Sequence, residues 1–178
     1  MRRTRPVPCR VPLWRACVLA LGLGVSAGAL AEDLAAKVKA AYLFHLTKFV
    51  EWPSAPAGQE FRICLYGADP VATLMGDLGN RPVRDAALKV LVEPGIDPGQ
   101  CQILYVGQDD RRLPDLLRRV RSEPVLTVSD KPEFARQGGM VGFYPEAGKI
   151  KLEINPDAAR AARLRLSAKL LGLARTVP

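Results

Sequence analysis

The sequence predicts a single α/β domain built on a mixed, mainly parallel sheet of about six strands, with about five flanking helices. Two observations support this fold class. Short apolar runs alternate with segments of helical periodicity through the middle of the chain, as in parallel strands joined by helices. Near the end of the chain, two apolar runs are separated by a connection of hairpin length, which makes the sheet mixed.

The domain is expected to begin after a secretory signal peptide that covers residues 1–31. This segment carries five arginines and no acidic residue, and it contains a small-residue-rich apolar stretch. Ala29-Leu30-Ala31 supplies the A-x-A pattern of a cleavage site, so cleavage is expected between Ala31 and Glu32. The apolar stretch is shorter than the roughly 20 residues that span a bilayer, although an uncleaved anchor is the alternative. We expect export to the periplasm through the general secretory route.

Loss of this segment changes the charge balance of the chain. It removes five of the 26 basic residues and none of the 18 acidic ones, so residues 32–178 keep 21 basic against 18 acidic side chains, a net charge of +3. The basic character of the whole chain is therefore no reason to expect a nucleic-acid partner, and export argues against one. The remaining length suits one domain that buries about 68–70% of the surface of its unfolded chain.

The domain is expected to start with a helix from Leu34 to Val50, a stretch free of Gly and Pro in which apolar residues recur at helical spacing. Pro53 is expected to stop this helix. A strand over Phe61–Tyr66 follows. Gly67-Ala68-Asp69-Pro70 then supplies a turn, a helix cap and a proline at the first position of a second helix.

The middle of the domain continues the alternation of strands and helices. One of its helices places leucines on one side and arginines on the other, and a shorter helix is ended by two glycines. The expected strands are Leu88–Val92, Gln102–Val106 and Val125–Val128, and the expected helices are Arg111–Arg121 and Pro132–Arg136.

The last part of the domain starts with two strands, Met140–Tyr144 and Ile150–Ile154, that flank a glycine-containing connection of five residues, 145–149. This length predicts antiparallel pairing. Asn155-Pro156 is a helix cap followed by proline, so the apolar periodicity beyond it predicts one helix through Arg175.

Cys64 and Cys101 are the cysteines that remain after residues 1–31 are removed. In the oxidising periplasm two cysteines are more often paired than free, which favours a disulfide. A bridge that closes a loop of this length would stabilise the fold by about 3–4 kcal/mol in the chain-entropy model. The alternative is two buried thiols on neighbouring strands.

The chemistry of the chain gives little support to catalysis. Its single histidine, His45, falls on the first helix among apolar neighbours, where a packing role is expected more than that of a base. The proposed bridge would occupy both cysteines, which leaves no Cys–His pair and no Cys or His metal cluster. The sequence has no G-x-S-x-G, H-E-x-x-H or P-loop motif. We therefore expect no enzyme activity, no metal and no cofactor.

The turn after the first strand places a glycine before a helix N-terminus, an arrangement that can bind the phosphate of a nucleotide. Gly67 stands alone where a G-x-G-x-x-G fingerprint is needed, and Asp69 places negative charge at the helix start, so a structural turn is the better interpretation. Ligands in open α/β sheets nevertheless lie beyond the carboxyl ends of the strands. Asp69, Gln108, Ser129 and Asp130 are accordingly the candidates for a ligand or partner surface.

Two expected helices carry basic faces. Such a face is either a solvated outer surface or a surface that attracts anionic headgroups or an acidic receptor domain in a salt-dependent way. The basic residues are Arg111, Arg112, Arg118, Arg119 and Arg121 on one helix, and Arg160, Arg163, Lys169 and Arg175 on the other.

Several short motifs carry a family resemblance. They are Lys39-Ala40-Ala41-Tyr42-Leu43, Lys48-Phe49-Val50-Glu51-Trp52-Pro53, Ile63-Cys64, Cys101-Gln102-Ile103-Leu104-Tyr105, Leu126-Thr127-Val128-Ser129-Asp130, Phe134-Ala135, Gly138-Gly139-Met140, Glu153-Ile154-Asn155 and Ser167-Ala168-Lys169-Leu170-Leu171. In order and spacing these segments resemble the YfiR family over nearly all of Ala35–Ala174. The second motif adds Lys48 and Trp52 to the candidate ligand or partner surface.

The resemblance implies a periplasmic protein with a half-Rossmann-like fold that tends to form a homodimer. Such proteins bind the periplasmic portion of an inner-membrane diguanylate cyclase and hold it inactive, which lowers cyclic-di-GMP and biofilm formation. The bridge between Cys64 and Cys101 would match a family disulfide linked to redox sensing, whereas the chain has no second cysteine pair within residues 138–151. The alternative function is a small-ligand sensor for another membrane signalling protein, such as a sensor kinase, or for a transporter.

Overall fold

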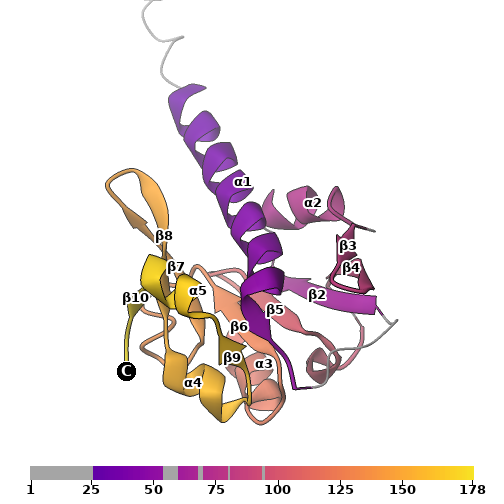
Figure 1. Ribbon diagram of the computed structural model, residues 1–178. Helices are drawn as coiled ribbons and strands as arrows, with labels where there is room; N and C mark the ends of the chain where they lie inside the picture. The colour runs from indigo at the N-terminus through magenta and orange to yellow at the C-terminus, as the bar shows by residue number, and fades with distance from the viewer. Residues whose placement is uncertain (1–25, 54–59, 68–69, 80, 94) are drawn as a thin grey trace, which may run out of the picture. The chain divides into compact units, whose positions relative to one another are not determined.

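The computed structural model describes residues 26–53, 60–67, 70–79, 81–93 and 95–178 (Figure 1). The chain divides into two compact units, residues 1–32 and 33–178, and the second contains the sheet. Among the described helices, none combines the length and the apolar character needed to cross a membrane.

An eight-stranded mixed sheet forms the centre of the second unit, in the order β10-β8-β7-β6-β5-β2-β4-β3. The four central strands β6, β5, β2 and β4 are mutually parallel. β7 pairs parallel to β6, β8 pairs antiparallel to β7, and β10 pairs parallel to β8 at the far edge. The strands are β2 (Glu60–Tyr66), β3 (Pro82–Val83), β4 (Ala86–Val92), β5 (Ile103–Val106), β6 (Leu126–Ser129), β7 (Val141–Glu146), β8 (Lys149–Ile154) and β10 (Arg175–Thr176).

Helices cover both faces of this sheet. One hydrophobic cluster joins α1, α2, α4 and α5 to the side chains on one face, and a second cluster lies under α3 on the other face. α1 crosses in front of the sheet in Figure 1. A separate two-stranded ribbon pairs β1 with β9. These elements are α1 (Ser26–Phe49), β1 (Val50–Glu51), α2 (Pro70–Gly76), η2 (Pro98–Gln100), α3 (Leu113–Val120), α4 (Pro156–Ala161), β9 (Arg165–Leu166) and α5 (Ala168–Leu173).

Alternation of side chains along the strands produces the two clusters. In β2, Ile63 and Leu65 point into the first cluster, whereas Cys64 and Tyr66 between them point into the second. Successive side chains of a strand point to opposite faces, so a strand covered on both sides is apolar throughout. This explains why β2, β5 and β6 are mainly apolar in the sequence, whereas β4, which is partly exposed, contains Lys89.

The α/β class and the mixed, mainly parallel sheet are confirmed, and each of the six expected strands is present. The short strands β1, β3, β9 and β10 were not expected. The late hairpin is antiparallel as predicted. The predicted five-residue length of its connection was wrong, because the strands extend to Glu146 and Lys149 and leave a two-residue turn. Ala147 and Gly148 both have positive φ in that turn, as a type I′ hairpin requires.

Two of the expected helices differ from the prediction. Residues 132–138 form a series of turns and no α-helix, because Glu133 has a φ of 59°, which interrupts helical geometry. The single helix expected from Pro156 to Arg175 is divided into α4, β9, α5 and β10. Arg163, with a φ of 61°, ends the first of these helices.

Candidate functional site

The carboxyl ends of the parallel strands are the place where an open α/β sheet binds ligands, and here they form a cluster of paired charges. β2 lies between β4 and β5, so the chain changes direction across the sheet at β2. Gly67 ends β2 with a φ of 102°, and a Cβ built on it would lie 3.4 Å from the backbone nitrogen of Gly107. The two strand ends therefore approach each other closely.

Arg112, in the loop after β5, joins these strand ends. Its guanidinium lies 2.5 Å from Glu93 Oε2 and 2.5 Å from Asp110 Oδ2, and it stacks over the ring of Tyr66 at 5.1 Å. Glu93 Oε1 accepts a hydrogen bond from the backbone N–H of Gly67 at 2.7 Å. The backbone N–H after β2 and the side chains after β4 and β5 are thus joined in one network.

The pairing determines the protonation of this cluster. Hydrogen bonds from Arg112 lower the pKa of Glu93 and the pKa of Asp110, whereas burial raises the pKa of Tyr66. Both carboxylates are therefore charged at neutral pH. A general acid or base needs a pKa near the working pH, and the lowered pKa values move Glu93 and Asp110 away from that range at neutral pH.

A second paired cluster lies beyond β6. Lys39 on α1 contacts Asp130 at 2.5 Å, and the other carboxylate oxygen of Asp130 accepts the backbone N–H of Gln108 at 2.9 Å. Ser129 is fully buried and donates to the carbonyl of Val106 at 2.6 Å. Lys39 thereby ties the first helix to the carboxyl edge of the sheet.

The structure therefore brings three of the predicted site residues together. Gln108, Ser129 and Asp130 are neighbours, but their described contacts are with the protein itself. Asp69 lies outside the described residues. Glu93 and Asp110 were missed, although they follow β4 and β5 and the rule that selected the others applies to them as well.

Lys48 and Trp52 lie elsewhere. Lys48 is exposed at the end of α1, with Nζ 5.2 Å from the Phe44 ring centroid. Trp52 is only 8% exposed and donates from Nε1 to the carbonyl of Gln102 at 3.0 Å, immediately before the amino end of β5. It belongs to the opposite end of the strand from the paired clusters.

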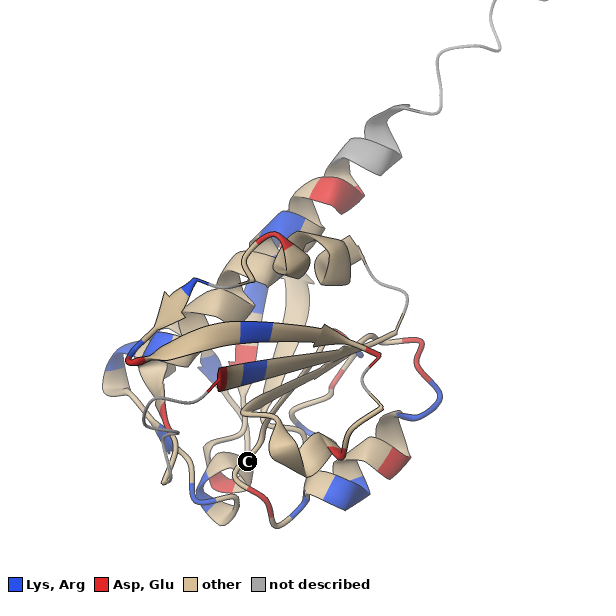
Figure 2. Cartoon of the chain, turned by 90° about the vertical axis from the view of Figure 1, so that its right-hand side faces the viewer, with Lys and Arg blue, Asp and Glu red and all other residues tan. Residues whose placement is uncertain are grey.

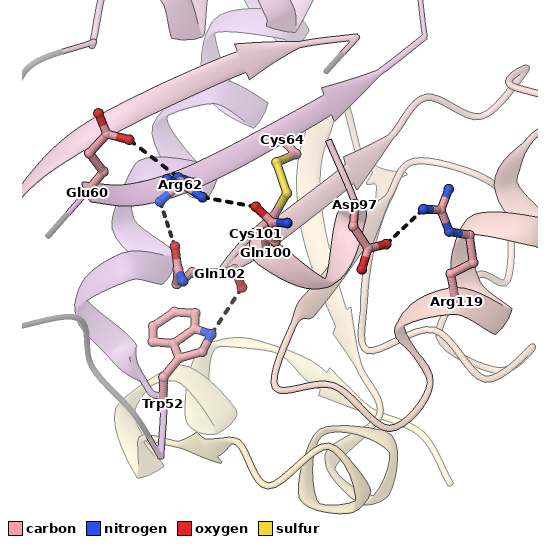
Figure 3. The surroundings of a disulfide bond; sticks show 9 residues. All are labelled: Trp52, Glu60, Arg62, Cys64, Asp97, Gln100, Cys101, Gln102 and Arg119. Atoms are coloured by element: carbon pink, nitrogen blue, oxygen red, sulfur yellow. Dashed lines mark hydrogen bonds and ion pairs between the residues drawn. A yellow bond between two sulfur atoms is a disulfide. The ribbon is translucent and has the colours of Figure 1, made fainter. Parts of the chain in front are cut away.

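The expected disulfide joins Cys64 to Cys101 (Figure 3). Cys64 is in the middle of β2, Cys101 lies two residues before the first residue of β5, and both are buried in the cluster under α3. Gln102 accepts the backbone N–H of Arg62 at 2.7 Å beside the bridge. Because both sulfur-bearing side chains are at most 1% exposed, a reductant reaches the bridge only if the surrounding segment opens.

His45 was expected to pack against its apolar neighbours, and this was wrong. Its side chain is exposed on α1, with its ring 6.1 Å from that of Phe44. Within the described part of the chain, no group of three His, Cys, Asp or Glu side chains is placed to hold a metal ion.

The basic face of α3 is largely neutralised by acidic neighbours. Arg112 pairs as described above, Arg118 pairs with Asp115, and Arg119 pairs with Asp97 at 2.8 Å. Lysines and arginines are interspersed with acidic residues across the view in Figure 2. This favours a solvated, locally balanced surface over one that attracts anions on α3.

A model of the family described as YfiR/HmsC-like matches residues 36–175 of the chain. The matched stretch begins in α1, reaches the first residue of β10 and contains the other strands of both sheets. The match confirms the family resemblance that the sequence motifs indicated.

Proposed function

Because the chain belongs to the YfiR/HmsC-like family, we propose that it is an exported regulatory protein that binds the periplasmic portion of an inner-membrane diguanylate cyclase and holds the cyclase inactive. Repression would lower cyclic-di-GMP and with it biofilm formation. The observation that carries the proposal is the extent of the family match, which runs from the first helix to the last strand.

The paired clusters at the carboxyl edge support a role without chemistry. An α/β enzyme places its substrate-binding groups at this edge. Here Arg112 is bonded to two carboxylates and Asp130 is bonded to Lys39, so these groups are engaged with one another. A protein that acts by binding a partner needs a rigid scaffold at this edge and no reactive group.

Repression of this kind requires only a difference in affinity. A protein that binds the inactive conformation of a cyclase more tightly than the active one shifts the cyclase population toward the inactive state. About 5.5 kcal/mol of differential affinity moves such an equilibrium from one per cent to 99 per cent inactive. The size of this difference in affinity depends on the contacts that the protein makes with each conformation of the cyclase.

We further propose that the protein acts as a homodimer. Size-exclusion chromatography with light scattering tests this, and a monomer at every concentration examined contradicts it. This proposal holds whichever membrane protein is the partner.

Chemical crosslinking in intact cells tests the partner. The tagged protein is crosslinked before lysis, the membrane fraction is solubilised, and the captured proteins are identified by mass spectrometry. A membrane diguanylate cyclase is expected among them. Capture of a sensor kinase or a transporter in its place, with no cyclase, contradicts the proposed target, and a version without residues 1–31 serves as the control for contacts made outside the periplasm.

A further inference from the structure

A hollow of about 570 Å³ lies beside the β1–β9 ribbon, away from the paired clusters. Its walls are Glu51, Trp52, Pro53, Arg160, Arg163, Leu164 and Arg165. We propose that this hollow binds a small ligand that carries an oxyanion group, either a phosphate or a carboxylate. The volume is within the range of small-molecule sites, roughly 300–1,000 Å³.

The arginines of the hollow are less neutralised than those of α3. Within the described residues, the Arg165 side chain has neither an ion pair nor a hydrogen bond, and Arg163 donates only to the backbone carbonyl of Ser122 at 3.3 Å. Arg160 pairs with Asp157, and that carboxylate is well exposed. Like charges repel when they are placed together, so an anion between these guanidinium groups would be stabilised.

The backbone at Arg163 gives a second reason to regard the hollow as a binding site. Arg163 follows α4 with a φ of 61°, and the N–H of Leu164 returns to the carbonyl of Ala159 at 2.9 Å to close the helix. Glycine is the residue that usually occupies this position, because other side chains are strained there. The presence of arginine in this strained backbone conformation motivates a functional hypothesis for its side chain.

A second arginine with positive φ lies behind the Trp52 wall of the hollow. Arg84, with a φ of 56°, donates to the carbonyl of Val50 and stacks 5.9 Å from the Trp52 ring. Trp52, which lines the hollow together with Arg163, is thus contacted from outside the hollow by a second arginine with positive φ. Its indole provides an apolar wall beside charged donors.

The guanidinium groups that line the hollow favour a ligand with an oxyanion group. Their planar donors form paired hydrogen bonds with phosphate and carboxylate oxygens. Glu51, which lies opposite Arg165 in the ribbon, is the acidic residue of the wall and would accept a hydrogen bond from a hydroxyl or ammonium group on the same ligand. A free metabolite and a phospholipid headgroup share this oxyanion chemistry.

Tryptophan fluorescence tests the site directly. The chain has two tryptophans, and Trp14 lies within the predicted signal peptide, so Trp52 is the reporter in the protein purified after export. The probes are inorganic phosphate, citrate, and phosphatidylcholine vesicles with and without phosphatidylglycerol. A saturable change in emission is expected with at least one of the anionic probes.

Three variants locate the binding. Arg163→Gly removes a guanidinium and suits the positive φ, so the fold is expected to be retained, and Arg165→Gln removes a second guanidinium. Each is expected to weaken binding roughly tenfold, the scale of one hydrogen bond to a charged group. Arg111→Ala, an exposed arginine on the other side of the sheet, loses the same charge and is expected to bind as the wild type does.

The outcomes separate the sources of the ligand. Loss of phosphate or citrate binding in both hollow variants supports a site for a free ligand, and loss of binding only to the anionic vesicles supports a headgroup site with the same chemistry. Absence of saturable binding to all of the anionic probes overturns the proposal. Binding that all three variants weaken equally also overturns it, because net charge and not the hollow would then be responsible.

Discussion

Lys39 and Asp130 show how a single ion pair can fix an element of this fold. Their side chains are 18% and 11% exposed, and their charged atoms are 2.5 Å apart. Removal of one partner from a largely buried pair leaves the other charge uncompensated, which is costly. The pair links α1 to the carboxyl edge of the sheet, so its loss affects both.

Lys39→Ala is expected to lower the free energy of unfolding by about 2 kcal/mol, because Asp130 stays desolvated without its partner. Lys37→Ala is the matched control on the same helix. Its pair with Asp33 is more than half exposed, and such pairs contribute less than about 1 kcal/mol. Urea denaturation measures both, and equal losses in the two variants would show that the helix substitution and not the ion pair is responsible.

Arg112 gives the stability a dependence on pH. It lowers the pKa of Glu93 and of Asp110 in the folded protein. A carboxylate with a lowered folded-state pKa contributes stability that is present above its unfolded pKa of about 4 and is lost as the pH falls through the folded value. The wild type therefore loses stability on acidification below about pH 5.

Arg112→Gln is expected to reduce this acid dependence, by at most about 1 kcal/mol because Glu93 and Arg112 are partly exposed. The urea midpoint is measured in steps from about pH 6 to about pH 3. Arg111→Gln, which alters an exposed arginine next to it, serves as the control. Parallel curves for the wild type and Arg112→Gln would show that the pair does not set the pKa values of these carboxylates.

At the scale of elements, two helix caps of different burial can be compared. Asn155 caps α4 by accepting the N–H of Ala158 at 2.9 Å, and its side-chain amide donates to the carbonyls of Ala135 and Pro178 at 3.1 and 3.2 Å. Ser167 caps α5 with one bond, from the N–H of Leu170 at 3.2 Å. The Asn155 side chain thus bonds to three segments, at Ala135, Ala158 and Pro178, whereas the Ser167 side chain bonds, among the described residues, only within the helix that it caps.

Asn155→Ala is expected to destabilise the protein by about 2–3 kcal/mol, and Ser167→Ala by about 1 kcal/mol. Asn155→Asp keeps the cap but cannot donate, so it is expected to fall between Asn155→Ala and the wild type. Thermal or urea unfolding ranks the variants. If Asn155→Asp equals the wild type, the two amide hydrogen bonds contribute nothing and only the cap matters.

The disulfide is the strongest constraint between elements, since it ties the middle of β2 to the start of β5 across 37 residues. Cys64→Ala with Cys101→Ala is expected to lower stability by about 3–4 kcal/mol in the chain-entropy model. Unfolding under oxidising and reducing conditions measures this. The double variant should be insensitive to reductant, and a wild type that is equally insensitive would contradict the stabilising role of the bridge.

β2, β5 and β6 could be predicted from the sequence because each is a mainly apolar run that is largely buried on both faces. The division of residues 156–175 could not, because apolar periodicity continues through both short helices. Tertiary pairing overrides that periodicity, since β9 pairs with β1 and β10 pairs with β8. Ser167, a good helix cap in the middle of the predicted helix, was the available sign of a break.

The candidate site was predictable only in part for a related reason. Strand ends can be located from the sequence, which is how Gln108, Ser129 and Asp130 were selected. Their partners come from distant parts of the chain, because Lys39 is on α1 and Glu93 follows β4. The sequence shows which residues follow a strand. The partners with which those residues form ion pairs depend on how the elements pack.

At the scale of the whole molecule, the proposed function needs only an α/β scaffold that presents a surface to a partner. The middle of the sheet is buried on both faces, ion pairs join the strand ends at its carboxyl edge, and the family match extends through the domain. The proposed function places the activity in the membrane partner. A regulator of this kind has an effect only in the compartment where the partner presents its binding surface.

The most direct test of the central claim is the cyclic-di-GMP content of cells that lack the protein, measured after complementation with the full chain or with residues 32–178 retained in the cytosol. The full chain is expected to lower cyclic-di-GMP, and the retained form is expected to leave it unchanged. Cyclic-di-GMP that is unchanged by the full chain, or lowered equally by the retained form, would contradict an exported repressor of a membrane cyclase.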